Sequence, residues 1–282
     1  MTARRANQDD GGPPQKKTKE NPGKDYPDTP VDPKDNDADS SKTLDSSAEN
    51  EVISSSPYLK DFSDSTRRRV KICESFVSES QLIYSINRVP TDIAWGANKP
   101  FNNLSDIICG GQGTEKKPIT FWIIGQATQI YFMNAASELT DKVTIGVLPS
   151  LLGVGKKTSD LLEGLSNSSK KQDESDWGEL RATAWQSKYV NGARQKPIPF
   201  DAVYDAREGY SDKSSMRKLS LCDINRRDLI LVEASIKRYA VDRQQFRRAW
   251  DKWQACLTLK AVSLVAKAPE LVAEEKSSGI SF

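Results

Sequence analysis

The chain has 282 residues, 41 Lys and Arg against 39 Asp and Glu, four cysteines and no histidine. The absence of histidine excludes a catalytic triad that depends on histidine and a zinc site with a histidine ligand. The cysteines are far apart and form no CxxC pair, so we expect reduced thiols rather than disulfides. Polar residues interrupt the longest uncharged run, 118–137, and we expect no membrane span.

The N-terminal segment differs in composition from the rest. Residues 1–60 are rich in Asp, Ser, Lys and Pro and carry 9 Lys and Arg against 12 Asp and Glu; the remainder carries 32 against 27. Such a segment buries too little apolar surface to offset its conformational entropy. We therefore expect a disordered tail over 1–62, a folded and mildly basic region over 63–269 with a candidate internal boundary in the loop 166–176, and a flexible tail over 270–282.

Two basic clusters near the N-terminus have the spacing of a bipartite nuclear localisation signal. Arg4 and Arg5 are followed by ten residues and then by Lys16, Lys17 and Lys19. An extended segment can place two such clusters in two acidic grooves of a nuclear import receptor. The pattern predicts a nuclear protein; the alternatives are a chance charge cluster in a polar tail and a cytoplasmic protein.

Hydrophobic periodicity predicts the elements of the first part of the folded region. We expect helices from Asp64, as N-cap, to Pro90, over 158–165 and over 177–189. Strands are expected over 119–124 and 142–148, where β-branched and aromatic residues gather. The segment 127–139 is compatible with a helix or with continuation of a strand.

The C-terminal part gives the clearest pattern. We expect strands over 202–207, 228–239 and 257–266. In the second of these, apolar residues alternate with polar ones and predict one buried face: Ile230, Val232, Ala234 and Ile236.

A helix is expected between the last two strands. Asp242 and Gln245 fit a capping pattern, and an apolar stripe follows at helical spacing: Phe246, Trp250, Trp253 and Leu257. Tryptophans on such a stripe are more often core than stacking platforms for bases. The basic side chains around it are the better candidates for contact with nucleic acid or a protein partner: Lys237, Arg238, Arg243, Arg247 and Arg248.

These elements predict an α+β fold with mixed helices and a small antiparallel sheet. A strand, a short basic helix and a strand are compatible with an OB-like barrel in the C-terminal part, where loops bind single strands. Other small α+β folds are equally compatible with this order.

The C-terminal block also resembles a group of sequences. VYDAR, DLILVE, KRY and LKAVSLVAKAP within about 200–269 are similar to uncharacterised predicted proteins of mushroom-forming fungi. This resemblance implies a fungal origin and brings no activity and no catalytic residues.

The sequence therefore favours a non-enzymatic nuclear protein that binds nucleic acid or belongs to a nucleic-acid complex. The first alternative is a protein–protein interaction module without a nucleic-acid role. The second is an enzyme that works without histidine, for example around Tyr204, Asp205 and Arg207. No motif predicts a cofactor or a metal ion, and the oligomeric state is open.

Overall fold

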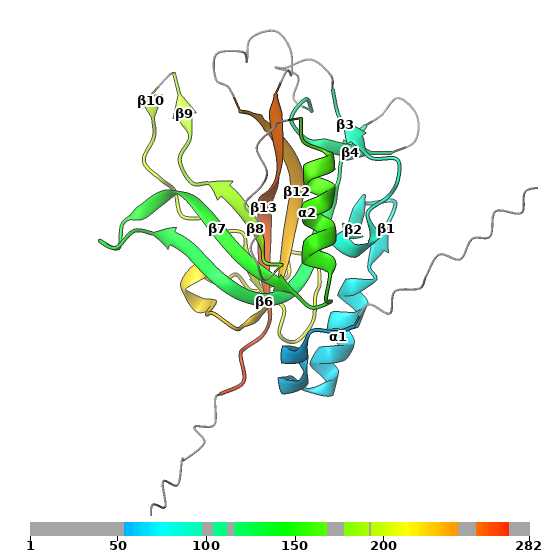
Figure 1. Cartoon of the computed structure of the whole chain (residues 1–282). Coiled ribbons are helices and arrows are strands. Elements are labelled where there is room, and N and C mark those ends of the chain that lie inside the picture. The colour runs from blue at the N-terminus through cyan, green and yellow to red at the C-terminus, as the bar shows by residue number, and fades with distance from the viewer. Residues whose placement is uncertain are drawn as a thin grey trace, which may run out of the picture. The chain divides into compact units, whose positions relative to one another are not determined.

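The structure is a computed structural model that describes residues 54–97, 104–111, 116–167, 178–191, 193–241 and 252–270 (Figure 1). These residues form mostly β-strands, with two α-helices and three short 3-10 helices. The elements in chain order are η1 Pro57–Asp61, α1 Asp64–Glu74, β1 Val77–Ser78, β2 Ile83–Ser85, η2 Ile86–Arg88, β3 Ala94–Trp95, β4 Ile108–Gly110, β5 Lys117–Pro118, β6 Thr120–Met133, β7 Leu139–Pro149, α2 Val154–Gly164, β8 Leu180–Trp185, β9 Tyr189–Val190, β10 Ala193–Arg194, β11 Val203–Asp205, η3 Leu221–Asp223, β12 Leu229–Ala240 and β13 Trp253–Ala266.

Five strands close into a barrel. Around the ring, β6 pairs with β7, β7 with β8, β8 with β13, β13 with β12, and β12 returns to β6. All these pairs are antiparallel except β8 with β13, which run parallel. If the five strands are counted along the chain, their order around the ring is one, two, three, five, four. The remaining strands are short and lie at the margins of this barrel or in two small antiparallel sheets.

The barrel interior is filled by alternate residues of its strands, as the period of two in a strand requires. On β12, the residues expected to share one face, Ile230, Val232, Ala234 and Ile236, are all buried in the main apolar core. Ala255, Leu257 and Leu259 face them from β13. The expected inner face of β12 is thus confirmed.

A second apolar cluster lies outside the barrel, beneath α1. Val70 of α1 and Leu59 of η1 pack there against Trp122 of β6 and Leu231 of β12. The ring of Phe76 stacks on Trp122, with centroids 4.1 Å apart. The outer side of β6 and β12 is therefore covered.

Several expected elements are confirmed. The strands expected over 119–124, 142–148, 202–207, 228–239 and 257–266 correspond to β6, β7, β11, β12 and β13, and the helix expected over 158–165 to α2. The undecided segment 127–139 continues β6 and then turns into β7. The described residues contain more strand and less helix than expected, so the mixed helices of the α+β expectation were overstated.

The first helix is shorter than predicted. It is capped by Ser63, whose hydroxyl accepts from the amide of Thr66, and it ends at Glu74 rather than near Pro90. The apolar residues after it follow strand pairing instead: Ile83 lies in β2, which pairs parallel to β6. Ordered structure also begins before residue 63, because Leu59 and Phe62 are buried.

The helix expected over 177–189 is wrong. Leu180–Trp185 is the strand β8, in which Leu180 and Ala182 face the core. Alanines at 182 and 184 favour a helix locally, and pairing with β7 and β13 overrides that preference. Because α2 contacts β8 and β13 directly, the elements on either side of the loop 166–176 belong to one core.

Candidate nucleic-acid interface

Most of the basic residues singled out by the sequence lie outside the described residues. This holds for Arg4, Arg5, Lys16, Lys17 and Lys19 of the expected localisation signal, which stays a prediction. It holds also for Arg243, Arg247 and Arg248 and for Trp250, which belong to the connection between β12 and β13. Trp253 and Leu257 are described and lie in β13, not in a helix.

Arg238 is buried rather than ligand-facing. Arg238 is 5 % exposed, and its guanidinium lies over the rings of Trp95 and Trp253, 4.6 and 5.1 Å from their centroids. It donates hydrogen bonds to the carbonyl oxygens of Ser105 and Ala97, each at 2.9 Å. Burial lowers the pKa of Arg238 to about 10, so the group remains a cation at neutral pH. Arg238 is therefore buried, contrary to the exposure expected of it, and its contact with a partner stays a prediction.

Lys237 lies on the opposite side of β12, because successive side chains of a strand alternate. Its ammonium group is half-exposed and forms an ion pair with Asp106, at 3.3 Å. Lys237 and Arg238 therefore do not form one exposed basic patch.

An exposed surface that the sequence did not single out lies on the outer side of β6, β7 and β8. Thr144 stands opposite Tyr131 on one neighbouring strand and opposite Thr183 on the other. The inward neighbours of Thr144, Val143 and Ile145, are fully buried. We call this surface the open face; its outward residues are Tyr131 on β6, Lys142 and Thr144 on β7, and Arg181, Thr183 and Trp185 on β8.

Two aromatic rings stand out on the open face. Trp185 is 62 % exposed and Tyr131 is 54 % exposed. The ammonium group of Lys142 lies 4.2 Å from the centroid of the Trp185 ring, which is the geometry of a cation–π contact. Between the rings, the hydroxyl groups of Thr144 and Thr183 are 3.3 Å apart.

The other cation of this surface is Arg181, which lies across Gly146 of β7. Its Nε donates to Glu179 at 2.8 Å, and the Arg181 side chain is 54 % exposed. A Cβ on Gly146 would come within 2.8 Å of the Glu179 carboxylate and 2.5 Å of the Thr128 hydroxyl. The glycine therefore lets Glu179, the ion-pair partner of Arg181, lie close to the strand.

Proteins that bind single-stranded nucleic acid commonly do so with exposed aromatic rings beside cations and hydroxyl groups. Bases stack on the rings, and cations and hydroxyl groups meet the phosphates. A sequence signal for this surface exists in the alternation of Arg181, Thr183 and Trp185 with apolar residues. It was missed because the segment was predicted as a helix.

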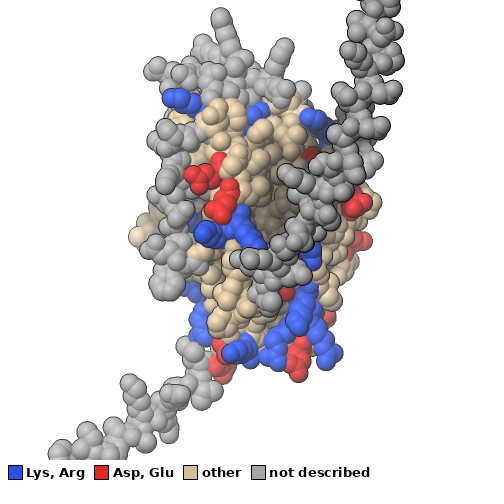
Figure 2. Space-filling view, turned by 45° about the vertical axis from the view of Figure 1, so that its right-hand side comes forward, with Lys and Arg blue, Asp and Glu red and all other residues tan. Residues whose placement is uncertain are grey.

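Two arginines of α1 are engaged by neighbouring groups. Figure 2 shows the side that carries α1, where Lys and Arg gather at the lower end among Asp and Glu. On α1, Arg67 pairs with Asp64, and Arg69 donates to the carbonyl oxygens of Ala206 and Arg207 at 2.9 and 2.7 Å. This cluster holds the fold together more than it offers free charge.

The residues considered for an enzyme do not assemble acid–base chemistry. Arg207 binds both carboxylate oxygens of Asp205, at 2.8 and 2.6 Å. These hydrogen bonds lower the pKa of Asp205 to about 2, which makes it a poor base.

In the part of the chain that the structure describes, no group of His, Cys, Asp and Glu could hold a metal ion. The same part contains no helix long and apolar enough to cross a membrane.

Comparisons with known proteins assign this chain to no family. No family model matches the chain, and no curated protein matches it in sequence. Among solved structures, the chain is similar to gp2.5, a single-stranded DNA binding protein encoded by bacteriophage T7. That similarity covers 58 % of this chain and 97 % of the phage chain, with 12 % identity and a TM-score of 0.34.

Proposed function

We propose that this protein binds single-stranded nucleic acid along the open face. The proposal starts from the topology. A five-stranded Greek-key barrel is the architecture of OB folds, which bind oligonucleotides on their second and third strands and on the loops between strands one and two and between strands four and five. The second and third barrel strands here are β7 and β8, the strands that carry most of the open face.

The observation that carries the proposal is the exposure of Trp185 beside Lys142. A tryptophan that is 62 % exposed keeps a large apolar surface in water, and a neighbouring cation adds attraction for phosphate. Tyr131 offers a second ring two strands away, across Thr144. Both rings stand on the same surface, where each can stack on a base of an extended strand.

The connection between the fourth and fifth barrel strands adds basic residues by sequence. It runs from Ala240 to Trp253 and contains Arg243, Arg247 and Arg248. In OB folds this connection is one of the two loops that bind the ligand. The sequence-based choice of these arginines is therefore kept within the proposal.

The test is titration of the full chain with labelled single-stranded DNA and RNA, followed by fluorescence anisotropy. Substituting Trp185→Ala removes a stacking platform, and we expect the dissociation constant to rise by about 5- to 150-fold, which corresponds to about 1–3 kcal/mol. Wild-type affinity should also fall steeply with salt.

The matched control is Ile72→Ala on α1, where an equally exposed apolar side chain, at 63 %, lies on the covered side of the barrel. This variant should bind as the wild type does. Absence of binding at low salt, by the wild type and by an Arg243, Arg247 and Arg248 triple-alanine variant alike, contradicts the proposal. Retained affinity in Trp185→Ala would point to another face.

A further inference from the structure

A groove lies next to the open face, along one edge of β6. β12 pairs with this edge only as far as Gln126, although β6 continues to Met133. Beyond Gln126 no strand of the described part lies on this edge, and the segment 221–227 runs beside it. The groove between them has a volume of about 480 Å³. Its lining residues come from β6 and from this segment: Gln129, Ile130, Tyr131, Phe132, Leu221, Cys222, Ile224, Asn225 and Arg226.

Hydrogen bonds and burial hold both walls of the groove in place. The amide of Arg227 donates to the carbonyl oxygen of Ala127 at 2.7 Å. Nε of Arg226 donates to the carbonyl oxygen of Thr128 at 2.8 Å. Leu221 anchors the wall opposite β6, because its side chain is buried in the main apolar core. The two walls are therefore joined to one another and to the barrel.

The polar groups of the groove suit a nucleotide. Among its lining residues, Arg226 is the one that carries a charge. Its Nε is engaged by a backbone carbonyl oxygen, and a guanidinium has further N–H donors that can meet a phosphate. The carboxylate of the neighbouring Asp223 accepts from the amide of Ser220, at 2.8 Å. Gln129 and Asn225 add amides, which both donate and accept hydrogen bonds.

Tyr131 belongs both to the groove and to the open face. Its ring is 54 % exposed, and it faces the same side of β6 as Gln129, two residues earlier. A strand that crosses the open face from β8 over β7 reaches Tyr131 on β6 and then the groove. The groove is therefore continuous with the proposed binding surface.

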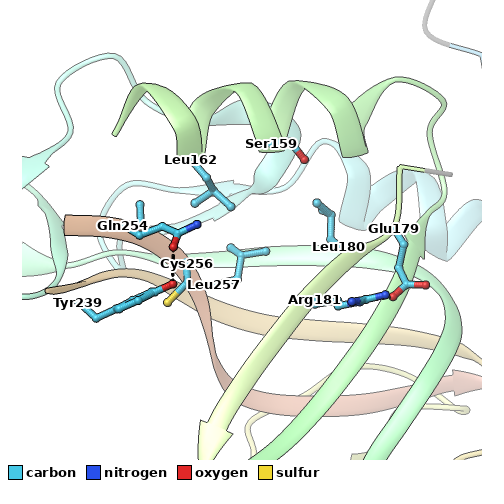
Figure 3. Close-up of a pocket in the computed structure, with 10 residues that line it drawn as sticks. Ser159, Leu162, Glu179, Leu180, Arg181, Tyr239, Gln254, Cys256 and Leu257 are labelled. Atoms are coloured by element: carbon cyan, nitrogen blue, oxygen red, sulfur yellow. Dashed lines mark hydrogen bonds and ion pairs between the residues drawn. The ribbon is translucent and has the colours of Figure 1, made fainter. Parts of the chain in front are cut away.

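Another margin of the open face is less favourable for a bound strand. There Arg181 lines a cavity bounded by α2, together with Glu179. Figure 3 shows the Glu179 carboxylate turned towards the Arg181 guanidinium, and the two are joined by a hydrogen bond of 2.8 Å. A carboxylate in this position offsets the charge of Arg181 and repels phosphate. The groove beside Tyr131 is therefore the better continuation.

We infer that a single strand bound on the open face continues past Tyr131 into this groove, where Arg226 contacts its phosphate. The base that stacks on Tyr131 and the phosphate that Arg226 holds then belong to neighbouring nucleotides. Extended peptides also pair with unpaired strand edges, but the cation and the continuity with the open face favour nucleic acid here. This inference rests on the proposed function.

The first experiment compares Arg226→Gln with the wild type by anisotropy titration of labelled oligothymidylate at several salt concentrations. Loss of one phosphate contact should raise the dissociation constant by about three- to tenfold. It should also reduce the slope of log affinity against log salt by about one. The matched control is Arg68→Gln, at an exposed arginine of α1 on the covered side of the barrel. This variant should bind as the wild type does.

A second variant separates contact with phosphate from support of the groove wall. Lysine keeps the positive charge, so Arg226→Lys should keep the salt slope of the wild type. If Arg226 acts only through its hydrogen bond to Thr128, both variants should instead weaken binding alike, without a change of slope.

Cys222 reports on the groove directly. Of the four cysteines it is the exposed one, and it lines the groove, whereas Cys73 lies half-buried on α1. Saturating oligothymidylate should slow alkylation of Cys222, measured by mass spectrometry of its peptide, and leave Cys73 unaffected. In Trp185→Ala, protection of Cys222 should require a higher oligonucleotide concentration, because one strand covers both places.

The outcomes separate the two proposals. If the wild type binds no single strand, the proposed function itself is wrong. If it binds, but Arg226→Gln keeps the affinity and slope of the wild type and Cys222 is not protected, then the strand does not enter the groove and only the open face remains. Equal weakening by Arg226→Gln and Arg226→Lys, with an unchanged slope, would also overturn the inference.

Discussion

β6 and β12 carry outward side chains beneath α1, whereas β7 and β8 leave theirs in solvent. Two tryptophans show the contrast. Trp122 points out of β6, is 5 % exposed, and stacks on Phe76; Trp185 points out of β8 and is 62 % exposed. The same residue type thus completes a packed layer on one side of the barrel and remains open on the other. The open face is therefore the side of the barrel where a large aromatic ring stays accessible to a partner.

Polar groups follow the same division. On the covered side, Glu233 of β12 is buried and accepts from Tyr210 at 3.0 Å and from Lys213. Burial and the Glu233 carboxylate raise the pKa of Tyr210, which keeps it protonated as the donor. These bonds attach the segment around Tyr210 to the barrel. On the open face, Lys142 and the threonines contact neighbouring strands.

The largest effect is expected from the covered side. Leu231 is fully buried between β12 and α1, and Leu231→Ala should lower the free energy of unfolding by about 2–5 kcal/mol because it leaves a cavity. Urea denaturation measures this loss. The folded variant should keep its oligonucleotide affinity; a loss of affinity in fully folded protein would mean that the covered side also serves binding.

A smaller loss of stability is expected at Arg238. Arg238→Gln removes charge-assisted hydrogen bonds to two carbonyl oxygens and should cost at least about 2 kcal/mol in unfolding free energy, again by urea denaturation. The adjacent Lys237→Gln, which breaks only a half-exposed ion pair, is the matched control and should change stability by less than about 1 kcal/mol. If Arg238→Gln leaves the stability unchanged and weakens oligonucleotide binding, then Arg238 contacts the ligand.

The smallest effect on stability is expected on the open face. Lys142→Gln should change the unfolding free energy by no more than about 0.5 kcal/mol. It should reduce the slope of log affinity against log salt by about one, as loss of one phosphate contact does. Lys71→Gln, an exposed lysine on α1, serves as the control and should leave the slope unchanged. Equal slopes for wild type and Lys142→Gln would remove Lys142 from the interface.

The sequence predicted β12 well because its pattern is unambiguous. In β12 the apolar residues recur at every second position over seven residues, and the observed strand Leu229–Ala240 differs from the expected one by a single residue at each end. In β8 the pattern spans only six residues and includes Ala182 and Ala184, so local preference favoured a helix. Because β8 was predicted as a helix, the open face could not be predicted from the sequence.

The site could be predicted only in part for a related reason. Alternation along β12 already places Lys237 and Arg238 on opposite sides of the strand. It does not show that Trp95, far away in the sequence, packs on Arg238. The number of aromatic and basic residues was therefore informative, but which of them the fold buries depends on contacts between distant segments.

The stack of Trp95, Arg238 and Trp253 fixes where the connection between β12 and β13 starts and ends. Ala240 pairs with Trp253, and the indole of Trp253 donates to the carbonyl oxygen of Leu165, just past α2. Both ends of the connection therefore lie at one anchored point. Residues that are joined to one anchored point have a raised effective concentration near it, so contacts that are weak singly can act together.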